Sequence, residues 1–475
     1  MITLPRVTTL TDALWAMLLG VTVGVLCLID PVIAAAVIVA GVFAVHVLRR
    51  PMLVCYTVIA ATVFLSGMPR DGLVPVFIPN EPILVLLAGL SWFILMVRRG
   101  QVNYRGSFLL ALVIFVGGTA IAPTVAYYAR GFSLRIGDLF SLIAPVQYLV
   151  MVWIFSQIPQ TDRERYRILQ WMLFCASLVA LIGILQAANF TPVSTILAQW
   201  YPSRHLNQAA NLGRVTSVLG AWNSLGNYLM ITLLMILATY RDEQTRLGWV
   251  NTITALFLCG FCLLASGSFA SIIGLALGAI LMKTVFDRRG LKLLLLLVLG
   301  FVIGAFLFQE NIAERLGYQF GDGSSLLPST LAYRFVVWQE LYFPIIGRNI
   351  WWGISPTFEG IISWSWAESQ YLFLLVRSGL FSLLAHLAFV VLMLRWLRGG
   401  IRQANGLSRS LAITVYIILV ALTVMGLTNE VFTSSGAIDY FWILVGLTAG
   451  ALSRKTLPIT QTATAPALVS QREGA

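Results

Sequence analysis

Arginine, glutamate and tryptophan residues gather in one long polar segment of an otherwise apolar chain, residues 309–367. Arg334 and Trp338 are four residues apart there, a spacing that places both side chains on one face of a helix. A guanidinium group binds a diphosphate through two parallel hydrogen bonds, which an ammonium group cannot do. Tryptophan rings beside carboxylates suit a sugar, because the rings stack on the sugar face while the carboxylates accept from its hydroxyl groups. The segment therefore indicates a site for a phosphorylated glycan.

A second arginine, Arg214, stands just before another apolar stretch, in the sequence GRVTS at 213–217. The phosphates of a lipid diphosphate lie at this depth, just outside the hydrocarbon. Arginines at a membrane boundary also extend to phospholipid headgroups, and this alternative stays open for Arg214 and Arg334 alike. The tryptophans next to apolar stretches, such as Trp364 and Trp366, can equally form an aromatic belt at the interface.

Glu368 closes the polar segment and has two possible roles. It can act as a general base for a sugar hydroxyl, or it can pair with a basic residue and hold the segment in place. Arg377, which lies inside an apolar stretch, requires a partner, and the candidates are Glu368, Glu430 and Asp439. Another group of charges consists of Arg130, Arg135 and Asp138.

The elements that must position these residues are membrane helices. Of the 475 residues 59% are hydrophobic and 11% are charged, and the mean hydropathy is +0.87, whereas roughly a quarter of a soluble protein is charged. Continuous apolar stretches without period-two alternation predict an all-α integral membrane protein with about fourteen transmembrane helices. The helices are expected at residues 13–29, 31–48, 52–67, 82–97, 107–128, 136–156, 168–188, 218–240, 248–265, 269–286, 291–308, 370–396, 411–427 and 439–452.

The basic residues orient this arrangement. On one side of the membrane fall 22 of the 31 lysines and arginines, and the positive-inside rule assigns that side to the cytoplasm. Both termini are then cytoplasmic, and the long loops 189–217 and 309–367 lie outside. One membrane domain is expected over 1–455, followed by a disordered tail at 456–475. The net charge of +12 is spread over many short loops, which argues against nucleic-acid binding.

All five cysteines fall in predicted helices, where apolar packing is their expected role. Cys259 and Cys262 have the spacing of a redox or zinc motif, but a membrane helix is an unusual place for either. The sequence predicts neither a metal nor a cofactor.

Over roughly residues 205–395 the chain resembles the O-antigen ligase and polymerase superfamily, which consists of membrane glycosyltransferases that act on undecaprenyl-diphosphate-linked glycans. The resemblance rests on six short motifs in a fixed order. They are RVTSVLGAWN at 214–223, SGS at 266–268, Arg334 with Trp338, GISP at 353–356, ESQYL at 368–372 and SGL at 378–380. Ligases that act on lipid A core carry a histidine where this chain has Glu368, which favours the polymerase branch.

The resemblance implies a GT-C-like architecture in a bacterial inner membrane and a metal-independent polymerase of surface polysaccharide (O-antigen, capsule or exopolysaccharide). Arg214 and Arg334 would hold the diphosphate, and Glu368 would be the general base. The implied substrate-binding residues are Arg377, Trp338, Tyr371, Asn223, Arg135 and Arg348. The implied partners are an undecaprenyl-diphosphate-linked oligosaccharide, membrane lipid, and the chain-length regulator and flippase of the same pathway.

Three alternatives remain. A ligase would transfer the glycan to another acceptor. A lipid-linked oligosaccharide flippase or other transporter usually has repeated halves and charges at the bilayer midplane. A scaffold of an export complex would not need the two arginines.

Overall fold

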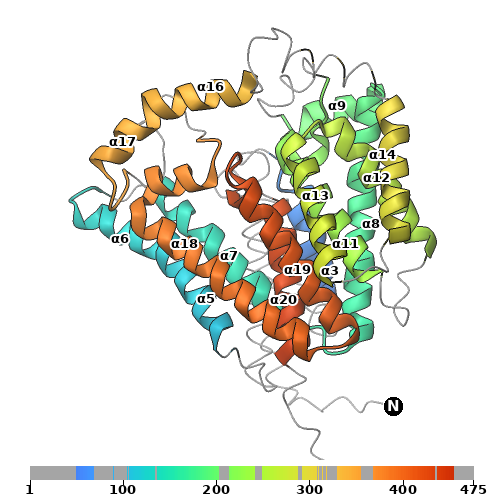
Figure 1. Ribbon diagram of the computed structural model, residues 1–475, viewed down its shortest axis with the longest axis horizontal. Coiled ribbons are helices and arrows are strands. Elements are labelled where there is room, and N and C mark those ends of the chain that lie inside the picture. The colour runs from blue at the N-terminus through green and yellow to red at the C-terminus, as the bar shows by residue number, and fades with distance from the viewer. Residues whose placement is uncertain are drawn as a thin grey trace, which may run out of the picture.

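The computed structural model describes residues 50–68, 106–133, 136–202, 213–240, 249–286, 291–307, 329–354, 367–433 and 436–453, together with residues 89, 104, 309, 313 and 317. Every regular element in these ranges is a helix (Figure 1). The all-α class predicted from the sequence is therefore confirmed for this part of the chain. The tail at 456–475 and the helices expected at 13–29, 31–48 and, except for residue 89, 82–97 lie outside it.

In the described ranges, five helical segments are long and apolar enough to cross a membrane, and each coincides with a predicted membrane helix. They are α5 with η1 and α6 (Ser107–Ala129), α8 (Asp162–Ala187), α11 (Trp222–Thr239), α18 (Gln370–Gln403) and α19 (Gly406–Met425). Shorter apolar helices stand at four other predicted positions. The transmembrane character expected from the composition is thus supported by the helices themselves.

The other helices of the described ranges complete the bundle. They are α3 (Met52–Phe64), α7 (Ile136–Gln157), α9 (Thr191–Trp200), α12 (Trp249–Ser266), α13 (Phe269–Leu281), α14 (Leu291–Leu307), α16 (Ser329–Val337), α17 (Phe343–Arg348) and α20 (Ala437–Ser453). Three five-residue π-helical turns are η1 (Gly117–Ile121), η3 (Met282–Phe286) and η4 (Trp338–Tyr342), and two 3₁₀ turns are η2 (Ser217–Leu219) and η5 (Val431–Thr433).

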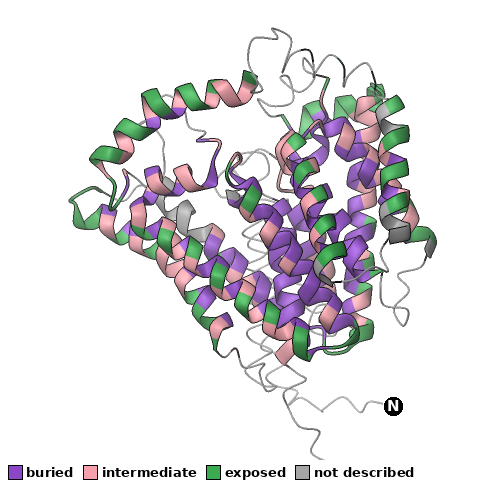
Figure 2. Cartoon of the chain, viewed as in Figure 1, coloured by how far each residue is buried: buried purple, intermediate pink, exposed green. Residues whose placement is uncertain are grey.

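The core of the bundle runs along α11 and α20, whose residues 225–239 and 437–451 are all buried (Figure 2). Trp442 of α20 stacks on Tyr148 of α7 with ring centroids 5.5 Å apart. Helices at the periphery turn large apolar side chains outward, with Phe306 of α14 72% exposed and Val125 of α6 60% exposed. A water-soluble bundle would place polar residues there, whereas lipid tails accept these side chains without cost.

The start of α8 shows how charged residues are accommodated at a helix end. Thr161 and Glu164 form a reciprocal capping box, in which each side chain accepts the other residue's backbone N–H. Arg165 is 4% exposed, pairs with Asp162 at 2.6 Å, and donates to the carbonyl of Gly450 at 3.3 Å. The guanidinium therefore satisfies a carbonyl in the last turn of α20 and ties two core helices together.

The two predicted outer loops contain helices of their own. Helix α9 lies in the loop 189–217, and α16, η4 and α17 lie in the loop 309–367. Figure 1 shows α16 and α17 as an arm across the end of the bundle at which α18 begins. This arm carries the arginine and tryptophan that the sequence singles out.

Candidate functional site

Arg334 and Glu368 form an ion pair where the arm meets the start of α18. The Nε of Arg334 donates to Oε2 of Glu368, and its Nη1 donates to the carbonyl of Thr428 at 3.0 Å. The two side chains are 25% and 34% exposed, so the pair is accessible from the surface of the protein. A guanidinium has five N–H donors, and these two hydrogen bonds use two of them. With respect to the described residues, three N–H groups therefore remain for a further anion.

Trp338 confirms the predicted helical face. Its Nε1 donates to the carbonyl of Ala367 at 2.7 Å, next to the residue that Arg334 contacts. Tyr342, one further turn along the arm, is fully buried. The ring of Phe335 meets Trp338 edge-on with centroids 5.2 Å apart. The arm thus presents an arginine, an indole and a phenol in succession to the segment 367–368.

The backbone of Glu368 is in the left-handed region, with φ of 49°. A residue with a Cβ rarely adopts this conformation, which costs about 1–3 kcal/mol and persists only where the surroundings enforce it. Here the carboxylate of Glu430 accepts the N–H of Glu368 at 2.9 Å. A strained residue that carries a charged side chain is typical of a functional site.

Glu430 is a buried carboxyl group, only 8% exposed. Burial raises its pKa to about 7, the nearby charge of Glu368 adds to the increase, and the backbone N–H groups of Glu368 and Ala367 oppose it. The pKa of Tyr342 is also raised, first by burial and then by the charges of Glu430 and Glu368. The site therefore combines a carboxyl group that titrates near neutrality with an ion-paired one.

Gln370 anchors the loop that carries Glu430. Its backbone N–H donates to the carbonyl of Gly426 at 2.8 Å, and its side-chain oxygen accepts the N–H of Phe432 at 3.0 Å. The hydroxyl of Ser369 also donates to Gly426, at 3.3 Å. The first residues of α18 and the loop 426–432 are therefore held together by hydrogen bonds from both directions.

Helix α18 is broken at Gly379, where φ is 73°, so the single helix predicted over 370–396 is wrong in this respect. Residues 350–354 pack into the break. Leu380 donates to the carbonyl of Ile350 at 2.7 Å, and Ile354 donates to the carbonyl of Val376 at 2.8 Å. A Cβ at Gly379 would collide with the carbonyl of Trp351, and one at Gly353 would collide with the backbone of Arg377. The motifs GISP at 353–356 and SGL at 378–380 thus meet in space at Gly353 and Gly379.

The other arginines around this break have separate contacts. Arg130, at the end of α6, donates to the carbonyl of Gly353 at 2.9 Å and holds the inserted segment. The guanidinium of Arg377 lies 5.5 Å from the centre of the Phe373 ring. Arg348 is exposed at the end of α17, and Arg135 lies outside the described residues. Glu368 is one of the three acids that the sequence offers as partners for Arg377, and it forms an ion pair with Arg334.

Arg214 lies in a different neighbourhood, just before α11. Its guanidinium is 4.7 Å from the centre of the Trp222 ring, at the first residue of α11. The neighbouring Ser217 has φ of 49°, and its N–H donates to the side chain of Gln186 at 2.8 Å. Asn223 is half-buried in the first turn of α11. Arg214 and Arg334 therefore have different immediate surroundings.

The loop between α19 and α20 contacts Arg334 at one end and the turn η2, which follows Arg214, at the other. Thr428 accepts from Arg334, while Gly436 lies against the side chain of Leu219 in η2, five residues after Arg214. Gly436 comes eight positions after Thr428, and an extended chain over eight positions spans at most about 28 Å. The two arginine neighbourhoods are therefore joined by a short segment.

Two further sequence features have packing roles. Tyr371 donates to the carbonyl of Thr423 at 2.5 Å and so links α18 to α19. The serine motif at 266–268 leads into a buried chain of hydrogen bonds. The hydroxyl oxygens of Ser268 and Ser271 are 2.8 Å apart, and the Ser271 hydroxyl donates to Oδ1 of Asn227 at 2.9 Å. This chain binds α13 to α11.

The described cysteines at 55, 175, 259 and 262 are buried and form no disulfide, and Cys27 lies outside the described residues. In the part of the chain that the structure describes, no three His, Cys, Asp or Glu side chains are arranged to hold a metal.

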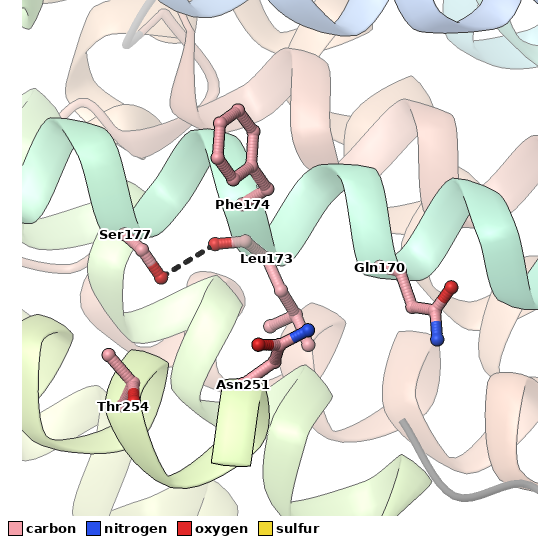
Figure 3. Close-up of a pocket in the computed structure, with 6 residues that line it drawn as sticks. All are labelled: Gln170, Leu173, Phe174, Ser177, Asn251 and Thr254. Carbon is pink, nitrogen blue, oxygen red and sulfur yellow. Dashed lines mark hydrogen bonds between the residues drawn. The ribbon is translucent and has the colours of Figure 1, made fainter. Parts of the chain in front are cut away.

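A cavity of about 180 Å³ lies between α8 and α12 (Figure 3). It is lined by Gln170, Leu173, Phe174, Ser177, Asn251 and Thr254, and the Ser177 hydroxyl donates to the carbonyl of Leu173 at 2.9 Å. These six residues carry no charge, so the cavity is poorly suited to a diphosphate. The ion-paired cluster on the arm is the stronger candidate.

Sequence comparison adds no relative to this picture. A scan against protein-family models found no match, and a search of curated proteins found none either.

Proposed function

We propose that this protein is a membrane glycosyltransferase that polymerises undecaprenyl-diphosphate-linked oligosaccharide repeat units into a surface polysaccharide. The proposal includes about fourteen membrane helices in a GT-C-like arrangement within a bacterial inner membrane, with the arm outside and both termini in the cytoplasm. Its support is the order of the sequence motifs together with the Arg334–Glu368 pair at the ends of apolar helices. The pair is the observation that carries the proposal.

Arg334 is suited to the diphosphate of the donor. Its side chain is partly exposed, and three of its five N–H groups are not used by Glu368 and Thr428. When the glycan leaves the lipid, negative charge grows on the departing diphosphate, and a prepositioned guanidinium stabilises that charge without a metal ion. Arg214 would act in the same way from the α11 side, through a substrate that bridges the two neighbourhoods.

In this proposal, Glu368 accepts a proton. In the proposed transfer, a hydroxyl oxygen of the acceptor repeat unit forms a bond to the anomeric carbon of the donor glycan. The bond from that carbon to the diphosphate oxygen breaks, and the hydroxyl proton passes to the carboxylate. Glu368 is 34% exposed and adjoins Arg334, so one site can hold both the leaving group and the base.

The remaining residues shape the site. Trp338 is 9% exposed and Tyr371 links α18 to α19, and both use their polar atoms in internal hydrogen bonds, so they would support the site from below the glycan. Arg377, Arg348, Arg135 and Asn223 would contact the phosphates or sugars of longer substrates.

The test is incubation of the purified protein with a lipid-linked repeat unit and analysis of the product lengths on a gel. The wild type should produce a ladder of polymer, and Arg334→Ala should not. Glu340→Gln is the matched control, because Glu340 is exposed on the same arm. A ladder from Arg334→Ala as long as that of the wild type would remove the arginine from the mechanism.

A further inference from the structure

Glu430 contacts the candidate base through the backbone. Its Oε1 accepts the N–H of Glu368 at 2.9 Å, across 62 residues of sequence. The Glu430 side chain is buried, whereas the Glu368 side chain faces outward toward Arg334. The two carboxyl groups are therefore neighbours with different tasks.

The contact falls at the strained residue. With φ at 49°, Glu368 is in a conformation that a residue with a Cβ avoids, so some interaction must compensate. On its C-terminal side, Ser369 and Gln370 are fixed by hydrogen bonds to the loop 426–432. The backbone N–H of Glu368 itself donates to the carboxyl group of Glu430. If this acceptor were removed, the N–H would lose its partner, and the backbone could relax toward an extended conformation.

We propose that Glu430 is a positioning residue of the site, whose carboxyl group fixes the left-handed backbone of Glu368 and thereby aims the Glu368 carboxylate at Arg334. The inference rests on the proposed function for its catalytic consequence, but its structural part stands alone. Among the described residues, the charged and titratable groups that face Glu430 include Glu368 from the start of α18, Tyr342 from η4, and Arg334 of α16 through its pair with Glu368.

The protonation of Glu430 then affects the site near neutral pH. Burial raises its pKa from 4.5 to about 7, so the folded state binds a proton that the unfolded state has already lost between these values. Over that range the stability of the fold decreases as pH rises. Above it, a second negative charge stands beside Glu368. A glutamine at position 430 keeps an oxygen that can accept the N–H but cannot ionise.

The experiment compares Glu430→Ala, Glu430→Gln and the control Glu340→Gln in the full-length protein. Removing the acceptor leaves a buried donor without a partner, and we expect Glu430→Ala to lower the polymerisation rate by at least about tenfold. Glutamine should restore most of that loss. When the pH is raised from about 6 to about 8, the midpoint temperature of unfolding of the wild type should decrease. The midpoint temperature of Glu430→Gln should decrease less.

The polymerisation rate and the pH dependence of the thermal midpoint distinguish a failure of this inference from a failure of the proposed function. Wild-type activity in Glu430→Ala, or the same pH dependence of the midpoint in the wild type and Glu430→Gln, would overturn the inference. If Glu430→Ala does not fold, the glutamine variant and its midpoints decide. If the wild type makes no polymer, the proposed function fails, and the pH dependence of unfolding still tests the role of Glu430.

Discussion

Replacing the two members of the Arg334–Glu368 pair separates a catalytic role from a structural one. Because the side chains are 25% and 34% exposed, solvent screens their attraction, and the pair contributes on the order of 0.2–1 kcal/mol to stability. The hydrogen bond from Arg334 to the Thr428 carbonyl adds about 1 kcal/mol. Arg334→Ala should therefore lower the free energy of unfolding by about 1–2 kcal/mol and leave a folded protein.

The expected loss of activity is much larger. A prepositioned donor to a developing charge contributes about 3 kcal/mol, which corresponds to roughly a hundredfold in rate. Arg334→Ala should lose at least this much, and Arg334→Lys should recover little of it, because an ammonium group cannot replace the planar fork. Glu368→Gln should lose nearly all activity with little effect on stability, since the amide oxygen still accepts from Arg334.

The charge reversal Arg334→Glu with Glu368→Arg completes the comparison. It can restore the ion pair but places neither the guanidinium nor the carboxylate where the proposed chemistry needs it. We expect the midpoint of unfolding to recover in the double variant while polymer synthesis stays absent. Recovery of polymer synthesis together with stability would refute the reasoning and reduce both residues to a structural pair.

Three other predictions concern the break in α18, the segment packed into it, and the membrane orientation. Gly379→Ala should destabilise the protein by about 2–4 kcal/mol, because the residue has positive φ and no space for a Cβ. The control Gly399→Ala lies in open space on the same helix and should be neutral or stabilising. Equal thermal midpoints of the two variants would contradict this prediction. Arg130→Ala should make the segment 350–354 more accessible to limited proteolysis, and unchanged cleavage would show that the Gly353 contact does not hold it. A cysteine at Ser324 should react with an impermeant thiol reagent once the outer membrane is permeabilised, and labelling only after lysis of the inner membrane would reverse the orientation.

The helices were predictable because apolar length is a local property. Stretches such as 107–128, 168–188 and 411–427 need no partner to be recognised, and the structure places helices there. The break at Gly379 was less accessible: a glycine within an apolar stretch is compatible with an unbroken helix, and only the segment 350–354 packing against it requires the positive φ.

The site was predictable in part. Spacing placed Arg334 and Trp338 on one face, and both contact the segment 367–368. Continuing that face by one turn would have reached Tyr342. From the sequence, Glu430 is only a candidate partner for Arg377, because no local pattern shows that a residue 62 positions away bonds to the backbone of Glu368. The pairing of Glu368 with Arg334 likewise depends on how the arm folds back over α18.

The proposed reaction makes one glycosidic bond for each lipid diphosphate that it releases. The most direct measurement therefore incubates the purified wild type with a lipid-linked repeat unit and counts released polyprenyl diphosphate against new glycosidic bonds in the polymer. We predict a ratio of about one, since the acceptor hydroxyl replaces the diphosphate at the anomeric carbon, and neither product should form with Arg334→Ala or Glu368→Gln. Release of the diphosphate without new bonds would indicate hydrolysis, and intact substrate moved across a vesicle membrane would indicate a flippase. Either result would contradict the assignment of this protein as a polymerase.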